Sequence, residues 1–307
     1  DLLILDTNFA DNLDSGVLRN ISATLGCSYA QICNFKVLKN GSTNISFSFE
    51  VQSGQDSSKY VYRHPKVGVS SENDWNAEIQ AQAIAESAGI DTTTLYEDMK
   101  YGWKISSFIC SAQIDVNRID GLDLLVSSIR SLHESNMSID KKFDFYLEAK
   151  RCAAQLSQCV GMSLRVFDDL VSRIDSLQKF LELDSSPVFL SHNDVSPRNV
   201  LVDSEGEIHL IDWEYAGMSD YASDFGSLCV CSELNDRQVY HCLCRYLGHQ
   251  PTLSELRHCY GMVAMAGWCW FLWSLLKEKE GVHVDRWLHV YYAFASTYSK
   301  RALSLYE

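Results

Sequence analysis

The sequence lacks any run of about 18 consecutive apolar residues, the length that a membrane span needs. Its most apolar segment, 261–276 (GMVAMAGWCWFLWSLL), is shorter and predicts a buried helix. Positive charge is also scarce, because 26 Lys and Arg face 40 Asp and Glu, for a net charge of −14, and no basic run occurs. Membrane insertion is therefore not expected, and nucleic acid is a poor partner, whereas a small cationic molecule suits so acidic a chain.

Proline is rare, with four residues in 307, and no flexible linker, internal repeat or secretory signal is visible. The eleven cysteines are odd in number and lack the repeated C-x-x-C spacing of zinc or redox sites. A metal site at Cys242, Cys244 and His241 is an alternative, but no second pair of ligands at zinc spacing accompanies them. We therefore expect reduced thiols in a cytoplasmic protein.

The N-terminal part predicts strands and one helix. Alternating apolar residues bounded by Gly, Ser and Asn turns predict a three-stranded antiparallel meander over 31–39, 45–51 and 59–65. A helix follows from about Asp74, which is a suitable N-cap, and Gly89 is a suitable stop. Two further strands flank a turn near Tyr101 and Gly102.

Beyond about Cys110 the apolar spacing becomes helical, except in 187–217, where two short apolar runs flank SEGE and predict a hairpin. We therefore expect an α+β protein with two lobes. The first spans 1–109, with a helix ahead of the strands and a hinge near 105–110, and the second spans 110–307.

His192, Asp194 and Asn199 form the pattern H-x-D-x-x-x-x-N of a kinase catalytic loop. An aspartate on such a loop can accept the proton of an attacking hydroxyl, and an asparagine five residues later can turn its amide oxygen to Mg²⁺. The expected hairpin follows at once and ends in Asp212, a second carboxylate suited to magnesium. The structural alternatives are a loop-stabilising Asp194 and a turn-capping Asp212, and His192 is expected to support the loop.

Three upstream features suit a bound nucleotide. The turn from Gly41 to Asn44 includes Ser42 and Thr43, whose amides and hydroxyls could contact phosphate oxygens, although an ordinary β-turn would look the same. Arg63 ends the third strand, where its planar fork could grip phosphate. Glu78, one turn into the following helix, is its natural partner.

These residues resemble the aminoglycoside phosphotransferase and choline kinase family, and most of all its bacterial choline kinase branch. The likeness is carried by 190–203 (LSHNDVSPRNVLVD) and 208–228 (IHLIDWEYAGMSDYASDFGSL), and extends from about Gln31 to 268–276. It implies a bilobal protein-kinase-like fold and transfer of the γ-phosphate of ATP, with Mg²⁺, to a small-molecule hydroxyl. By position it implies the following roles: Asp194 as catalytic base, Asn199 and Asp212 as magnesium ligands, Arg63 paired with Glu78 on phosphate, and Gly41 to Asn44 as the phosphate loop.

For the acceptor, the resemblance implies a cage for a quaternary ammonium group, built from Trp270 and Trp273, which are spaced to share a helix face. Further candidates are Trp268, Trp287 and Tyr215 as rings and Glu214, Asp220 and Glu233 as carboxylates. Glu233 lies two residues beyond Cys231, where choline kinases tend to carry glutamate. The alternative is that the tryptophans belong to the core.

Three functions stay open: a kinase of choline, ethanolamine or another amino alcohol; an aminoglycoside or other sugar kinase; and a catalytically silent nucleotide-binding regulator. A protein kinase fits poorly, because no A-P-E follows Asp212. Asp224 begins a D-F-G triplet. It lies too far beyond the hairpin to be a metal ligand placed by the second strand. We therefore expect it to brace the catalytic loop or to cap a helix.

Overall fold

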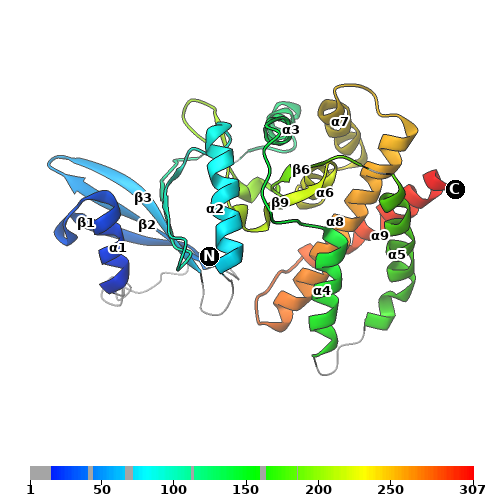
Figure 1. Ribbon diagram of the computed structural model, residues 1–307, viewed down its shortest axis with the longest axis horizontal. Helices are drawn as coiled ribbons and strands as arrows, with labels where there is room; N and C mark the ends of the chain where they lie inside the picture. Colours follow the sequence, from blue (N-terminus) through cyan, green and yellow to red (C-terminus); the bar gives the residue numbers. More distant parts are fainter. Residues whose placement is uncertain (1–14, 41–43, 66–71, 112–113, 160–163, 185) are drawn as a thin grey trace.

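The computed structural model describes residues 15–40, 44–65, 72–111, 114–159, 164–184 and 186–307. Its N-terminal part is a five-stranded antiparallel sheet in the order β1-β2-β3-β5-β4, which lies at one end of the molecule (Figure 1). The strands are β1 (Ile32–Asn40), β2 (Asn44–Ser53), β3 (Asp56–Pro65), β4 (Thr94–Glu97) and β5 (Lys104–Ser107). The meander and the two later strands are therefore confirmed.

Aromatic residues hold this sheet to the helix that precedes it, α1 (Ser15–Leu25). The rings of Tyr62 and Trp103 stack with centroids 5.6 Å apart, and the ring of Phe47 also stacks with that of Tyr62, at 5.2 Å. Ile21 of α1 is fully buried in the same cluster. Large rings on alternate positions of adjacent strands thus give this small lobe a core of its own.

Helix α2 (Glu72–Ser87) joins β3 to β4. It begins two residues earlier than expected, so Asp74 lies inside it, and it ends before Gly89, whose φ of +70° is the left-handed value that glycine adopts at helix ends. In Figure 1 it stands between the sheet and the remaining helices.

The rest of the chain is mainly helical, which confirms the α+β class. The helices are α3 (Ile119–Glu134), α4 (Phe145–Ser157), α5 (Asp168–Leu183), α6 (Ser223–Cys231), α7 (Asp236–Leu247), α8 (Leu253–Lys279) and α9 (Trp287–Tyr306). The boundary between the two lobes at residues 109 and 110 remains a prediction.

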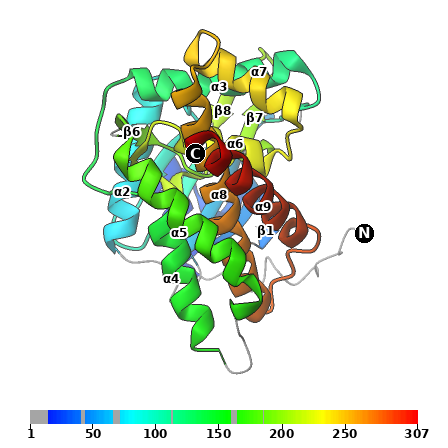
Figure 2. The ribbon, with the colours of Figure 1, turned by 90° about the vertical axis from the view of Figure 1, so that its right-hand side faces the viewer.

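Helix α8 is the centre of this part and runs between α5 and α9 (Figure 2). It begins at a capping box in which Thr252 and Glu255 bond each other's backbone N–H groups. By length and composition α8 could cross a membrane, but 83% of its most apolar window is buried inside the protein, as expected for a core helix.

Two glycines let the neighbouring helices approach α8 closely. A Cβ at Gly267 would lie 2.8 Å from the backbone nitrogen of Ala295 in α9. A Cβ at Gly226 of α6 would lie 2.7 Å from the carbonyl oxygen of Met262. Both distances are shorter than any real Cβ contact, so these crossings require glycine.

Two short antiparallel pairs lie between the sheet and the helices. β6 (Val188–Ser191) pairs with β9 (Gly217–Asp220), and β7 (Val200–Val202) pairs with β8 (Ile208–Leu210). The second pair is the hairpin expected from SEGE. The loop from β6 to β7 and the segment from β8 to β9 carry the candidate catalytic residues.

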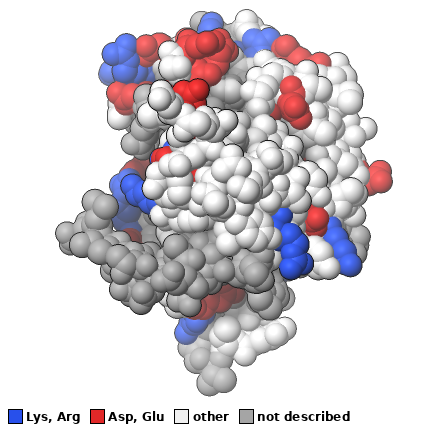
Figure 3. All heavy atoms as spheres, turned by 90° about the vertical axis from the view of Figure 1, so that its left-hand side faces the viewer, with Lys and Arg blue, Asp and Glu red and all other residues white. Residues whose placement is uncertain are grey.

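All eleven cysteines are free. His241 bonds Asp123 at 2.7 Å, and among the described residues no cluster with Cys242 and Cys244 could hold a metal ion. On the face in Figure 3, the described Lys and Arg side chains lie scattered among other residues and form no continuous patch.

Candidate functional site

The loop between β6 and β7 is held in place by Asp224, in the first turn of α6. This carboxylate is fully buried, and it accepts the backbone N–H groups of His192 at 3.1 Å and Asn193 at 2.6 Å. His133 also bonds Asp224 at 3.1 Å. Burial alone would raise the pKa of Asp224, but these hydrogen bonds and the histidine charge hold it below its ordinary value. The N-cap of α6 is Ala222, so Asp224 braces the loop and caps no helix.

His192 supports the loop as expected. Its Nδ1 accepts the backbone N–H of Asp194 at 3.2 Å, so its proton lies on Nε2, which donates to the carbonyl of Ile211 at 3.0 Å. The ring is completely buried. These bonds join the catalytic loop to the end of the hairpin, which leaves His192 in a supporting position.

Asp194 and Asn199 are held together. The amide nitrogen of Asn199 donates to the backbone carbonyl of Asp194 at 2.9 Å and to its carboxylate at 2.8 Å. The amide oxygen of Asn199 therefore points away from Asp194, as a metal ligand would require. Burial raises the pKa of Asp194 above its ordinary value, and the charge of Asp212 adds to this, while His192 and Arg198 oppose it. A raised pKa makes this carboxylate a better proton acceptor.

Asp212 follows β8 with φ and ψ of 72° and 67°, in the left-handed region. It precedes a short 3₁₀ turn, but its carboxylate makes no capping hydrogen bond. Instead, Oδ1 accepts Nη1 of Arg63 at 3.0 Å. The unusual backbone thus directs Asp212 toward the N-terminal sheet.

Arg63 is buried between two carboxylates. Its Nη2 donates to Glu78 of α2, so the expected pair is present. Lys104 lies behind, 3.2 Å from Glu97 and 3.9 Å from Glu78. Strand β3, helix α2 and the end of the hairpin therefore meet at one guanidinium.

Glu214 adds a further carboxylate to this cluster. It accepts the amide of Asn44 at 3.3 Å, the point where the start of β2 reaches the other lobe. Burial, together with the charges of Asp212 and Glu78, raises the pKa of Glu214 to about 8. Glu214 therefore keeps its proton to a higher pH than an ordinary glutamate.

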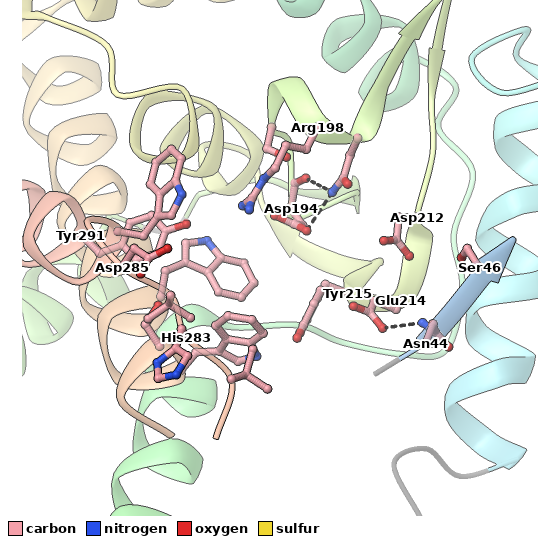
Figure 4. Close-up of a pocket in the computed structure, with 18 of the residues that line it drawn as sticks. Asn44, Ser46, Asp194, Arg198, Asp212, Glu214, Tyr215, His283, Asp285 and Tyr291 are labelled. Carbon is pink, nitrogen blue, oxygen red and sulfur yellow. Dashed lines mark hydrogen bonds between the residues drawn. The ribbon is translucent and has the colours of Figure 1, made fainter. Parts of the chain in front are cut away.

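Two cavities meet at these residues. One, of about 390 Å³, contains Asp194, Glu214 and most of the aromatic candidates (Figure 4). The other, of about 230 Å³, lies toward the sheet and is walled by Val61, Phe108, Ile109, Leu201 and Ile211. The residues that line both are Ser46, Arg63, Arg198, Asn199 and Asp212. An apolar chamber and a polar, ring-lined chamber therefore share one charged boundary.

Four aromatic candidates line the larger cavity: Tyr215, Trp270, Trp273 and Trp287. Trp270 meets Tyr215 edge to face at 5.1 Å and Trp273 at 6.0 Å. Trp270 is 4% exposed, and its indole nitrogen has no hydrogen-bond partner among the described residues. Trp273, only partly buried, offers more of its surface to the cavity.

Three candidates do not reach either cavity. Trp268 packs in the core against Phe271 at 5.7 Å, and Asp220 is bonded to His258 at 3.0 Å. Glu233 forms an exposed ion pair with Arg286 at 2.8 Å. Their expected contact with substrate is therefore corrected: each side chain is already used in packing or pairing elsewhere.

Three candidates, Gly41, Ser42 and Thr43, lie outside the described residues, and their role as phosphate loop stays a prediction.

Several residues that line the larger cavity were not predicted from the sequence, among them Arg198, His283, Asp285 and Tyr291. Arg198 stands inside the quoted motif, whereas the other three come from the α8–α9 connection and α9, which carry no motif.

The charged boundary fits a magnesium ion that also binds phosphate. Among the described residues no three His, Cys, Asp or Glu are arranged to hold a metal unaided. Mg²⁺ in kinases, however, is held by one or two protein oxygens together with substrate phosphates. Asp212 and the amide oxygen of Asn199 would supply such ligands, and beside them burial and the charges of Asp212 and Glu78 raise the pKa of Glu214.

Comparison with known proteins gives the family. The sequence model described as choline/ethanolamine kinase matches residues 35–237. A thiamine kinase of Salmonella newport is 28% identical over 166 residues, which are 53% of this chain and 58% of the relative. A LicA homologue of Mycoplasma capricolum is 24% identical over 127 residues, 40% of this chain and 47% of the relative. The chain thus spans about half the length of the curated relatives it matches.

Solved structures share the fold over nearly the whole chain. LicA in complex with AMP has a TM-score of 0.75 at 18% identity, covering 95% of this chain and 99% of that one. A choline/ethanolamine kinase family protein of Mesorhizobium loti has 0.71 at 22% identity, covering 95% and 94%. A spectinomycin phosphotransferase in complex with ADP and spectinomycin has 0.61 at 13% identity, covering 95% and 98%. The chain belongs to the choline/ethanolamine kinase family and has its protein-kinase-like fold.

Proposed function

We propose that this protein transfers the γ-phosphate of ATP to the hydroxyl of choline or a related small amino alcohol. The observation that carries the proposal is the meeting of two chambers at Asn199 and Asp212, with Asp194 beside them in the larger chamber. A phosphoryl donor and an acceptor must approach each other in line across such a boundary. The family membership supports the same chemistry.

The smaller, apolar chamber suits the base of the nucleotide. Its walls are aliphatic and aromatic, and Arg63 and Ser46 stand at its inner end, where the phosphates would lie. The AMP complex of LicA, which has the same fold, supports nucleotide binding in general. The turn at Gly41 to Asn44 would then cover the phosphates, and Arg63, oriented by Glu78, would bind them.

The larger chamber suits a cation. Trp270, Trp273 and Tyr215 present ring surfaces that attract an ammonium group, worth about 0.5–2 kcal/mol per ring. Asp285 lines the same space and adds negative charge. Glu214 also lines it, and a bound cation would lower its raised pKa and favour its ionised form. Asp285 would supply the carboxylate that choline kinases tend to carry at the position of Cys231. An ammonium held here would leave its hydroxyl directed at Asp194.

In the reaction, Asp194 would accept the hydroxyl proton, and Asn199 would keep its carboxylate in place. Mg²⁺, when bound at Asn199 and Asp212, would neutralise the phosphate oxygens. Since Asp194 works only when ionised, its raised pKa moves the acidic limit of activity upward from the ordinary range of aspartate.

Thiamine is the second acceptor to test. The rings of Tyr215, Trp270, Trp273, Trp287 and Tyr291 give the chamber several flat walls, which suit a planar aromatic cation as well as choline. The similarity to thiamine kinases points the same way.

The other two functions fit less well. An aminoglycoside site would require more carboxylates and fewer rings. The intact Asp194, Asn199 and Asp212 argue against a catalytically silent regulator. A cytoplasmic location also remains a prediction.

The test is ADP release with Mg²⁺ and ATP over a panel of choline, ethanolamine, thiamine, spectinomycin, kanamycin and methylthioribose. The matched control is Asp194→Asn, which keeps the shape of the loop. We expect turnover of a cationic alcohol that this substitution lowers by at least about 10²-fold. Turnover of an aminoglycoside alone would contradict the amino-alcohol proposal, and no turnover at millimolar acceptor would contradict it altogether.

A further inference from the structure

Arg198 stands at the boundary between the two cavities. Of the five residues that line both, only Arg63 and Arg198 carry positive charge. In Figure 4 Arg198 and Asp194 extend from the same loop. A cation at this boundary lies where the transferred group must pass.

Arg63 is already neutralised. It is buried, and it binds both Glu78 and Asp212. Two carboxylates on one guanidinium leave no net positive charge at that corner. Arg63 therefore cannot by itself offset the negative charge of a phosphoryl group.

The guanidinium of Arg198 has a different environment. It lies over the neutral ring of Trp287, 5.3 Å from the ring centre, and forms no ion pair with any described residue. It is close enough to Asp194 to oppose the rise in the pKa of that carboxylate. Its charge is thus near the reacting atoms and is not cancelled by a bound carboxylate.

The backbone of Arg198 is rigid. It is the middle residue of a 3₁₀ turn, Pro197–Asn199, in which proline restricts φ and the N–H of Asn199 bonds the carbonyl of Ser196 at 3.0 Å. The next residue, Val200, begins β7. The side chain therefore starts from a fixed point between the catalytic aspartate and the proposed metal ligand.

We propose that Arg198 is a catalytic residue that binds the γ-phosphoryl group during transfer, an inference that rests on the proposed function. The acceptor oxygen forms a bond to phosphorus, and the bond from phosphorus to the β,γ-bridging oxygen breaks, its electron pair leaving with ADP. The hydroxyl proton goes to Asp194. Arg198 donates hydrogen bonds to the non-bridging oxygens and gives up no proton, because its planar fork matches phosphate geometry.

The test compares the binding of AMP-PNP, which carries a γ-phosphate, with that of ADP, both with Mg²⁺ and without acceptor. We expect Arg198→Gln to weaken AMP-PNP binding about tenfold and ADP binding less than about twofold, a selective loss typical of one charged contact to phosphate. Arg198→Lys should fall between the two. With acceptor, Arg198→Gln should lower kcat by about 10²–10³-fold, with little change in the acceptor KM.

The matched control is Arg286→Gln. Arg286 also lies over the Trp287 ring, at 5.0 Å, but it pairs with Glu233 and lines neither cavity. Its replacement should leave the ratio of the two affinities unchanged. An unchanged ratio in Arg198→Gln would overturn the role of Arg198 while leaving the kinase proposal standing. Failure of the unmodified protein to bind either nucleotide would overturn both.

Discussion

Arg63 and Asp212 are 149 residues apart in the sequence and are joined by an ion pair of 3.0 Å. Arg63 also binds Glu78, so one guanidinium connects the N-terminal sheet, helix α2 and the end of the catalytic hairpin. The position of the proposed metal ligand is therefore coupled to the position of α2. Arg63 and Asp212 also both line the two cavities.

Replacement of Arg63 by methionine should be costly. It leaves Glu78 buried without its guanidinium, so we expect the free energy of unfolding to fall by about 3–5 kcal/mol in a urea titration. The double variant Arg63→Met/Glu78→Met should recover much of that stability but none of the nucleotide affinity. A double variant no more stable than the single one would show that burial of Glu78 is not the cause.

Asp224→Asn should damage the loop and leave magnesium use intact. An amide cannot accept two backbone N–H groups as a carboxylate does, so we expect a loss of about 2–4 kcal/mol in the free energy of unfolding. The magnesium concentration for half-maximal activity should change less than about twofold, as expected for a group that never touches the metal. A magnesium defect with unchanged melting would mean that Asp224, and not Asp212, binds the metal.

The tryptophans of α8 should divide into two classes. Trp273→Leu removes a cavity wall, so the KM for the cationic acceptor should rise about 5–30-fold while that for ATP changes little. Trp268→Leu should instead lower the free energy of unfolding by about 2–4 kcal/mol and leave both constants unchanged. If Trp273→Leu moved both constants together, Trp273 would belong to the core.

Glu214 should make stability depend on pH. Its pKa rises from an ordinary value of 4.5 to about 8 in the folded protein, so the folded state binds an extra proton between these values. The contribution of this group is therefore fully present below pH 4.5 and is lost as the pH rises through 8. Relative to Glu214→Gln, the unmodified protein should lose at least about 1 kcal/mol of stability between pH 5 and pH 9. A difference between the two proteins that does not change with pH would contradict the raised pKa.

The structure of the loop that carries Asp194 and Asn199 could be predicted from the sequence because its signal is local. Asp194 and Asn199 lie within one short loop, and the hairpin that follows delivers Asp212, so their spacing alone implies the geometry. The pairing of Arg63 with Glu78 also followed from the order of strand and helix. These parts required no knowledge of how the helical lobe packs.

The wall of the acceptor cavity could not be predicted in the same way. Helix α8 is buried on nearly all sides, so its apolar pattern does not say which tryptophan faces the cavity. Trp268 precedes Trp270 by two residues, about 200° around a helix, and points into the core. Asp285 and Tyr291 reach the cavity because α9 crosses close to α8 at Gly267, a tertiary contact that leaves no local motif.

The most direct measurement is a phosphorus NMR spectrum of the protein with Mg²⁺, ATP and choline, repeated with ethanolamine and thiamine. The account predicts a new phosphomonoester resonance that grows in step with ADP, and its absence in Asp194→Asn, which should still bind ATP. A protein that binds ATP but forms no phosphomonoester from any of these alcohols, or an equally active Asp194→Asn, would contradict it.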